Sequence, residues 1–418
     1  ARIPSRTTHT STTNPQRIEE VSQGTQQAYR AALRYYMQST SFGISSAQEE
    51  RYWHEDAIVG LGHASRFDSG HREHARRTAD RLDALPHNSL LPRHRILKAR
   101  ASLIRAHLAV YNWDADDALQ HWIRALLWAT GMPTRLARED RNAIVEASLA
   151  VTRAFAGSAR CNDAQRIIGH LEPLFPGWRD PESDLYDRVL HGRYAWADFM
   201  VCLLRACMSD DFLPDWGPAQ DRALAIVEIN RGHRLDEARG YSALARVAAH
   251  RGDPTQHQRW ADQHAACLPD VIEAAFMANT RVILLRRTEQ WSVLIDTPPP
   301  EVQNDFRWLR ACYWRDHGLA HAASGRMDQA EQDWSVGMAE TPQRHGLVGV
   351  PMFSLSRIAA AVRYYPESFN RELLRFEEAL HGWELRSARE HLYTIFMKYR
   401  EKPPTWDEVM RDLSRIPY

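Results

Sequence analysis

From about Ile18 onward, apolar residues recur three and four positions apart along almost the whole chain. This spacing lines one face of an α-helix, and the strict alternation of apolar and polar residues that marks a β-strand is not found over any convincing length. Glycine, proline, asparagine and aspartate interrupt the pattern at short intervals, which predicts brief connections between successive helices. We therefore expect an all-α protein built from helical hairpins.

The most regular hairpin pattern runs from Trp314 to Pro342, and the proline closes the unit. A small residue on each helix, Gly318 on the first and Ala330 on the second, lets two antiparallel helices approach closely. The ring of Trp334 is expected to fill the groove that they leave. Gly325 is placed to end the first helix.

This hairpin resembles the tetratricopeptide repeat. The Trp, Gly, Gly, Ala, Phe and Pro positions of that pattern fall on Trp314, Gly318, Gly325, Ala330, Trp334 and Pro342. His317 and His321 replace its usual Leu and Tyr, and we interpret them as packing positions rather than as chemistry.

Weaker copies of the unit precede it and keep some of its small, aromatic and closing residues. These repeat positions are Gly62, Ala118, Trp122, Ala164, Pro176 and Gly252. When the copies are aligned on Gly62, Ala106, Thr152, Ala245 and Gly318, the gaps are 44, 46, 93 and 73 residues. The last two gaps each fit a pair of units, and all exceed the usual period of about 34, which predicts longer helices or loops.

The resemblance implies a right-handed superhelical solenoid over residues 23–350. Residues 351–418 are less repetitive and predict a helical cap, whose last helix opens with a capping-box pattern at Thr405 and Glu408. Residues 1–22 are rich in Ser, Thr and Arg and are expected to be disordered.

Charge, cysteine content and apolar length limit the kinds of partner and the location expected for the chain. Lys+Arg and Asp+Glu both number 53, so the net charge is zero and nothing global attracts nucleic acid or a membrane surface. The five cysteines are odd in number and widely spread, which favours reduced thiols and a cytoplasmic location. The longest apolar stretch, residues 194–207, is too short to span a bilayer.

Catalytic and metal-binding patterns in the sequence are incomplete. The acidic runs at Asp116 and Asp117 and at Asp210, Asp211 and Asp215 lack the second helix that a Mg²⁺-dependent terpene-synthase-like site needs. His71, Glu73 and His74 share one helical turn but have no further ligand in view. Phosphate loops, nucleophile elbows and paired C-x-x-C motifs are missing. We therefore predict no enzyme, no metal and no cofactor.

The repeat alignment also predicts which side chains of each first helix face a concave surface. These candidate partner-binding residues are His63, Arg66, Arg100, His107, Arg153, Arg239, Arg246 and Arg315. Stacked in a solenoid, they would form an arginine-rich groove suited to carboxylates, since a guanidinium group can bind a carboxylate through two hydrogen bonds. The alternative is that these arginines pair with acids on neighbouring helices.

The resemblance thus implies a protein-interaction module, an adaptor, chaperone or regulatory scaffold, that binds a protein or an acidic or extended peptide. Two alternatives stay open. One is the ligand-sensing and oligomerising part of a bacterial-type transcription regulator, which predicts a closed pocket and a DNA-binding domain upstream of Ala1. The other is a secreted bacterial effector delivered to a host cell, which the N-terminal composition suggests. The oligomeric state is open in each case.

Overall fold

The computed structural model describes residues 46–64, 69–85, 92–112, 114–130, 137–158, 160–209, 214–302, 306–341, 349–381 and 386–414. Across these ranges the backbone is helical apart from turns, and none of their residues lies in a strand, which confirms the all-α class. Contacts divide the chain into two compact units, residues 1–56 and 57–418, and the description below concerns the second. The predicted N-terminal segment 1–22 lies outside the described residues.

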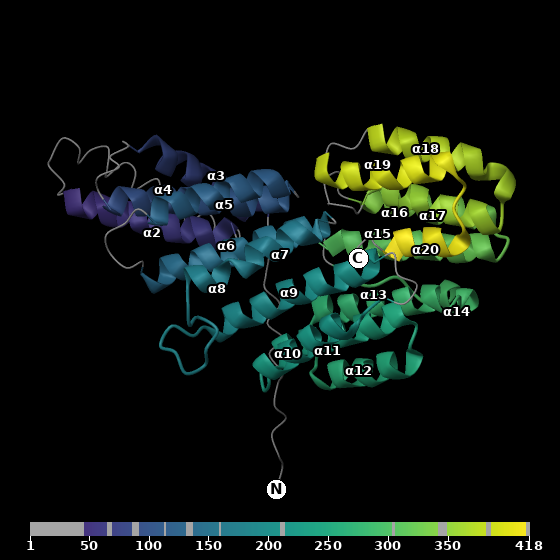
Figure 1. Ribbon diagram of the computed structural model, residues 1–418, viewed down its shortest axis with the longest axis horizontal. Coiled ribbons are helices and arrows are strands. Elements are labelled where there is room, and N and C mark those ends of the chain that lie inside the picture. Colours follow the sequence, from purple (N-terminus) through teal and green to yellow (C-terminus); the bar gives the residue numbers. More distant parts are fainter. Residues whose placement is uncertain are drawn as a thin grey trace, which may run out of the picture. The chain divides into compact units, whose positions relative to one another are not determined.

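The helices follow one another closely along the chain (Figure 1). The first are α2 (Ser46–Ala64), α3 (Ser69–Ala84), α4 (Pro92–Tyr111), α5 (Ala115–Thr130), α6 (Arg138–Gly157), α7 (Cys161–Gly169), α8 (Leu171–Leu174) and α9 (Arg188–Met208). Next come α10 (Gly217–Ile229), α11 (Arg234–Arg251), α12 (Pro254–Ala266), α13 (Val271–Arg287), α14 (Trp291–Ile295), α15 (Arg307–Ala323) and α16 (Met327–Glu340). The last are α17 (Val350–Arg363), the 3₁₀ turn η2 (Pro366–Ser368), α18 (Phe369–His381), α19 (Arg386–Glu401) and α20 (Trp406–Ser414).

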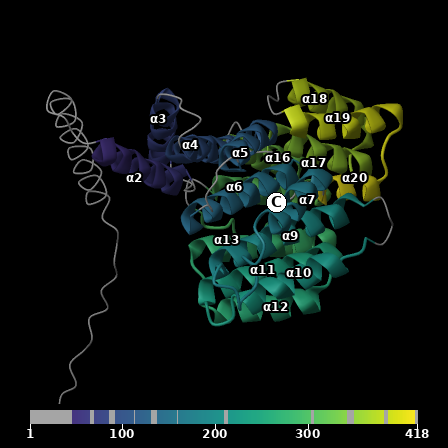
Figure 2. The same cartoon turned by 60° about the vertical axis from the view of Figure 1, so that its left-hand side comes forward.

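Consecutive helices pack as pairs, α4 with α5, α6 with α7, α9 with α10, α11 with α12 and α15 with α16. The leading helix of one pair also contacts a leading helix of the next, as α4 does α6, α6 does α9 and α15 does α17. Figures 1 and 2 show these neighbours side by side. Each hairpin therefore buries its apolar face on adjacent hairpins, as helical repeat proteins do.

The last four helices share one hydrophobic core with α15 and α16, a cluster that includes Trp334, Phe353, Phe376 and Phe396. The predicted cap therefore packs directly on the most regular hairpin. The predicted capping box opens α20, where Thr405 N donates to Glu408 Oε2 at 2.8 Å and Glu408 N donates to Thr405 Oγ1 at 3.3 Å.

The α15–α16 hairpin packs as its sequence predicts. Trp334 is fully buried, and its Nε1 donates to Arg315 O at 3.1 Å and to Ser356 Oγ at 3.2 Å. A Cβ added to Gly318 would lie 2.5 Å from Trp334 Nε1, so only glycine permits this approach. Gly325 follows the helix with φ +75°, in the left-handed region.

Most of the other repeat positions are also where the pattern puts them. Ala118, Ala164 and Ala330 are fully buried and Trp122 is nearly so, and Gly252 ends α11 in the left-handed conformation. Trp314 is half-buried, Pro176 lies in the turn after α8, and Pro342 lies outside the described residues.

The exception is Gly62, whose expected role in close packing is wrong. Gly62 is exposed, and a Cβ added there would meet nothing within 4 Å. Gly60 makes the close approach instead, since its added Cβ would lie 2.7 Å from Thr78 Cγ2. The register of the first unit is therefore shifted by two residues, which turns the expected face by about 200° around the helix.

Candidate functional site

Three of the arginines expected to line an exposed groove lie inside the protein. Arg100, Arg246 and Arg315 are only 6%, 4% and 1% exposed. Arg100 Nε donates to Asp140 Oδ1 at 2.7 Å, which joins α4 to α6. The expectation of a groove is wrong at these positions, because the leading helices pack on one another through the face that carries the arginines.

Arg315 belongs to a fully buried charge cluster. Its Nε and Nη2 donate to Asp316 Oδ1 and Oδ2 at 2.7 and 2.8 Å, and Arg286 Nη1 donates to Oδ1 at 3.0 Å. Burial disfavours the charged form of Asp316, but the two guanidinium groups outweigh it and hold the pKa of that carboxyl below its usual range. Burial lowers the pKa of Arg286 to about 10. This cluster ties α13 to α15 and presents no surface to a partner.

The two histidines of the predicted set also lie against protein. His107 is 6% exposed, and burial lowers its pKa to about 4, so it carries no charge near neutral pH. His63 is half-buried, with its ring centroid 4.7 Å from those of His71 and His74. These three rings form an aromatic contact between α2 and α3.

Only two predicted arginines reach the surface among the described residues of that set, and Arg66 lies outside the description. Arg153 is half-buried on α6. Arg239 is partly exposed on α11, where its Nε donates to Glu273 Oε1 at 2.9 Å. The structure therefore does not bring the predicted residues together into one groove.

A surface pocket of about 420 Å³ opens instead where α10, α11 and α12 meet. Its lining comes from these three helices and the turn between α11 and α12: Gln220, Leu224, Leu244, Val247, Ala248, Arg251, Asp253, Gln256, Arg259 and Trp260. The turn RGDP shapes it. Gly252 adopts φ +70°, and Asp253 caps α12 by accepting from Gln256 N at 3.0 Å. Pro254 at the first position of α12 suits this sharp start.

The floor of the pocket is apolar, and its rim is basic on balance, with Arg251 and Arg259 beside one acid, Asp253. Leu244 and Val247 are each 2% exposed and form part of the core beneath, while Trp260 is half-buried and stacks on Tyr241 at a centroid distance of 6.2 Å. Arg251 and Arg259 are exposed at the edge. This combination suits a side chain that buries apolar surface beside a negative charge.

Within the described residues, the two rim arginines make only an amide hydrogen bond and a cation–π contact. Arg251 Nη1 donates to Gln220 Oε1 at 3.1 Å, and the Arg259 guanidinium lies 4.7 Å from the centroid of the Trp260 ring. In the part of the chain that the structure describes, neither makes an ion pair with a carboxylate, unlike Arg160, Arg222 and Arg363. Arg251 and Arg259 were not singled out from the sequence, although Arg251 directly precedes Gly252, which the repeat pattern had marked, and Arg259 lies on the helix that follows.

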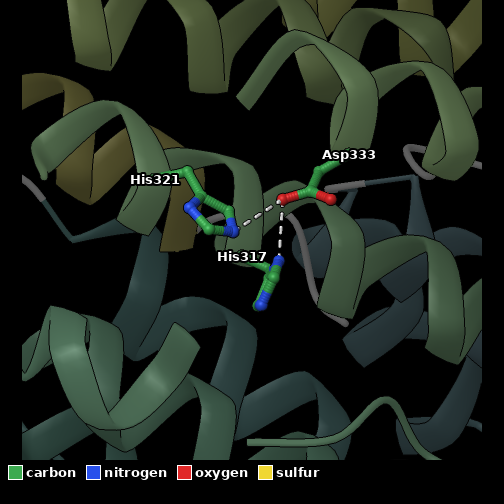
Figure 3. Close-up of side chains that lie close together, drawn as sticks. All are labelled: His317, His321 and Asp333. Carbon is green, nitrogen blue, oxygen red and sulfur yellow. Dashed lines mark hydrogen bonds and ion pairs between the residues drawn. The ribbon is translucent and has the colours of Figure 1, made fainter. Parts of the chain in front are cut away.

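A second arrangement of chemical interest lies inside the α15–α16 hairpin. His317, His321 and Asp333 turn toward one another (Figure 3), and their ligand atoms all lie within 4.8 Å of one another. The sequence interpretation of the two histidines as packing positions is right about their burial. It missed the carboxylate that both of them face.

The remaining sequence candidates have ordinary roles. Asp116 pairs with Arg160 at 2.6 Å, and Asp215 accepts from Gly217 N at 2.9 Å. Asp210 and Asp211 lie outside the described residues. All five cysteines are free thiols, as expected, and burial raises the pKa of Cys161 and Cys207 to about 12.

Comparison of the chain with protein-family models, curated proteins and solved structures gives no match. Among the described helices, none has the length and apolar character needed to cross a membrane.

Proposed function

We propose that this protein is an interaction module, a right-handed solenoid of tetratricopeptide-like hairpins, that binds an acidic, partly apolar segment of a partner protein. The observation that carries the proposal is the pocket of α10, α11 and α12, where a basic rim adjoins an apolar floor. Its role is binding rather than catalysis. The basic residues that would contact the partner are Arg251 and Arg259, in place of the buried Arg100, Arg246 and Arg315.

The two parts of the pocket make different contributions. An apolar side chain that enters it and leaves water gains about 1.5–3 kcal/mol. Each exposed pair between a rim arginine and a partner carboxylate adds about 0.2–1 kcal/mol, since water and salt screen it. The apolar floor therefore supplies most of the affinity, and Arg251 and Arg259 supply the preference for acidic segments.

The proposal is tested with a displayed library of short random peptides selected on the purified chain. We expect selected peptides to place Asp or Glu beside a Leu, Phe or Trp. The double variant R251E/R259E should weaken the selected peptides about tenfold or more in calorimetric titrations, because attraction becomes repulsion.

The matched control is R124E/R400E, which reverses two exposed arginines on α5 and α19 that make no ion pair within the described ranges. This control should bind as the unaltered chain does. Selection without acidic enrichment, or equal binding by R251E/R259E, would refute the proposal.

A further inference from the structure

We propose that His317, His321 and Asp333 form a binding site for a divalent transition-metal ion, with Zn²⁺ as the first ion to test. This inference is independent of the peptide pocket, which lies on other helices.

The backbone places the three side chains together. His317 and His321 are four residues apart on α15, so both rings project from the same face of the helix. Asp333 comes from α16. The neighbouring Trp334 packs against Gly318, and this close contact sets the distance between the two helices. The donors are therefore held by a rigid hairpin rather than by a loop.

His317 is enclosed by acceptors on both sides. Its Nδ1 lies 2.7 Å from Asp333 Oδ2, and its Nε2 lies 3.2 Å from Ile295 O. A neutral imidazole carries one N–H, so it satisfies one of these oxygens and presents a lone pair to the other. If the N–H is on Nε2 and is donated to Ile295 O, the Nδ1 lone pair faces Asp333, where a metal ion could join the two side chains.

This arrangement matches the way proteins bind metals. A ligating histidine commonly donates its other N–H to a backbone carbonyl, which selects the tautomer and orients the ring. Ile295 O, at the end of α14, stands in that position for His317. His317 Nδ1 is then free to act as a ligand.

His321 supplies the second nitrogen. Its Nε2 lies 3.6 Å from the same Asp333 oxygen, too far for a hydrogen bond, and its ring centroid is 4.7 Å from that of His317. A neutral imidazole keeps one nitrogen lone pair, and a metal ion competes with protons for it, so zinc binding should weaken as pH falls.

The distances are close to those of a tetrahedral site. Zinc bonds of about 2.0–2.2 Å imply ligand atoms about 3.3–3.5 Å apart. The separation of 2.7 Å from Asp333 Oδ2 to His317 Nδ1 must open, and the 3.6 Å to His321 Nε2 must close slightly. The ligand atoms of the two histidines, which lie within 4.8 Å of each other, must also approach to about 3.4 Å, so both imidazole rings must rotate toward the ion. Two imidazoles and one carboxylate leave a further coordination position, as in metal sites that keep an exchangeable ligand.

The surroundings hold the ligands and still admit an ion. Tyr313 stacks on His317 at a centroid distance of 5.0 Å, and its hydroxyl donates to Thr297 O at 2.6 Å. His317, His321 and Asp333 are 8%, 7% and 9% exposed, so each retains some contact with solvent. The bound ion would join α15 to α16 and thereby stabilise the hairpin.

The test is calorimetric titration of Zn²⁺ into the whole chain after removal of metals with a chelator. We expect one tight site per chain and a melting temperature raised by about 2 °C or more at saturating zinc. Bound Co²⁺ should show the visible absorption of a tetrahedral nitrogen and oxygen site. H321N and D333N should each weaken zinc binding at least about a hundredfold, the effect expected at minimum when a ligand is lost.

Two variants control for indirect effects. D140N breaks the buried Arg100–Asp140 pair, in which both side chains are 8% exposed, and so perturbs a comparable buried charge far from this hairpin. H71N removes a ring from the other histidine cluster. Both should keep the zinc site. No binding by the unaltered chain, or zinc affinity unchanged in H321N and D333N, would overturn the proposal and leave the cluster as a hydrogen-bonded histidine–aspartate pair.

Discussion

The close contact between Gly318 and Trp334 leads to a sharp prediction about stability. In Gly318→Ala, the new methyl group would lie 2.5 Å from Trp334 Nε1, 2.7 Å from Cδ1 and 3.0 Å from Cε2. Ordinary contacts are 3.4 Å or longer, so the indole must move by about 1 Å, and a buried ring with two hydrogen bonds has no free space for that. Overpacking of this kind costs about 1–3 kcal/mol.

Two further terms modify this magnitude. Alanine favours a helix over glycine by about 1 kcal/mol, which offsets part of the cost. Displacement of the indole lengthens its hydrogen bonds to Arg315 O and Ser356 Oγ, each of which contributes about 0.5–1.5 kcal/mol to stability. We therefore expect a net loss of about 1–3 kcal/mol in the free energy of unfolding.

The assay is urea denaturation followed by circular dichroism, with tryptophan fluorescence as a second probe. A double-mutant cycle with Trp334→Phe adds specificity, since the smaller ring should relieve part of the clash and make Gly318→Ala less harmful in that background. A Gly318→Ala protein as stable as the unaltered chain, or strictly additive effects in the cycle, would contradict the packing argument.

The remaining predictions concern the register of α2 and a buried histidine. Gly60→Ala should destabilise the fold by about 1 kcal/mol through its contact with Thr78, whereas Gly62→Ala should be neutral or stabilising by up to about 1 kcal/mol. If thermal unfolding shows the opposite order, Gly62 and not Gly60 is the close-packing position of α2. The pKa of His257 is lowered to about 4 by burial, so the unfolded chain takes up a proton near pH 6.5 that the folded chain refuses until about pH 4. Stability should therefore fall as pH drops from 6.5 towards 4, and His257→Gln should reduce that fall by up to about 3 kcal/mol, measured as unfolding free energy at pH 7.5 and 4.5; an unchanged pH dependence would mean that the ring titrates normally.

Local features of the chain were predictable because they depend on near neighbours. Gly252 and Gly325 end helices, and Thr405 with Glu408 opens one, through backbone conformations and hydrogen bonds within a few residues. The burial of Trp334 followed from a repeat pattern that itself encodes contact between adjacent helices.

The candidate sites were harder to predict, because each depends on which residues meet across helices. The local sequence does not distinguish Arg100 from a surface arginine. Its partner Asp140 is 40 positions away and reaches it only at the α4–α6 contact. Gly60 and Gly62 are equivalent as residues, and only the position of Thr78 decides which of them packs. The pocket at Arg251 and Arg259 likewise exists only because α11 packs on both α10 and α12.

The amino-acid sequence by itself determined that this chain is helical, where many of its helices begin and end, and that the α15–α16 hairpin packs a tryptophan against a glycine. The tertiary structure alone decided which arginines are buried and which line a pocket, and that His317 and His321 face Asp333. The physical reason is one of range. Helical periodicity and capping act over a single turn. Charge pairing, burial and metal-ligand geometry depend instead on the spacing and rotation of whole helices. A shift of one residue along a helix gives every side chain on it different partners.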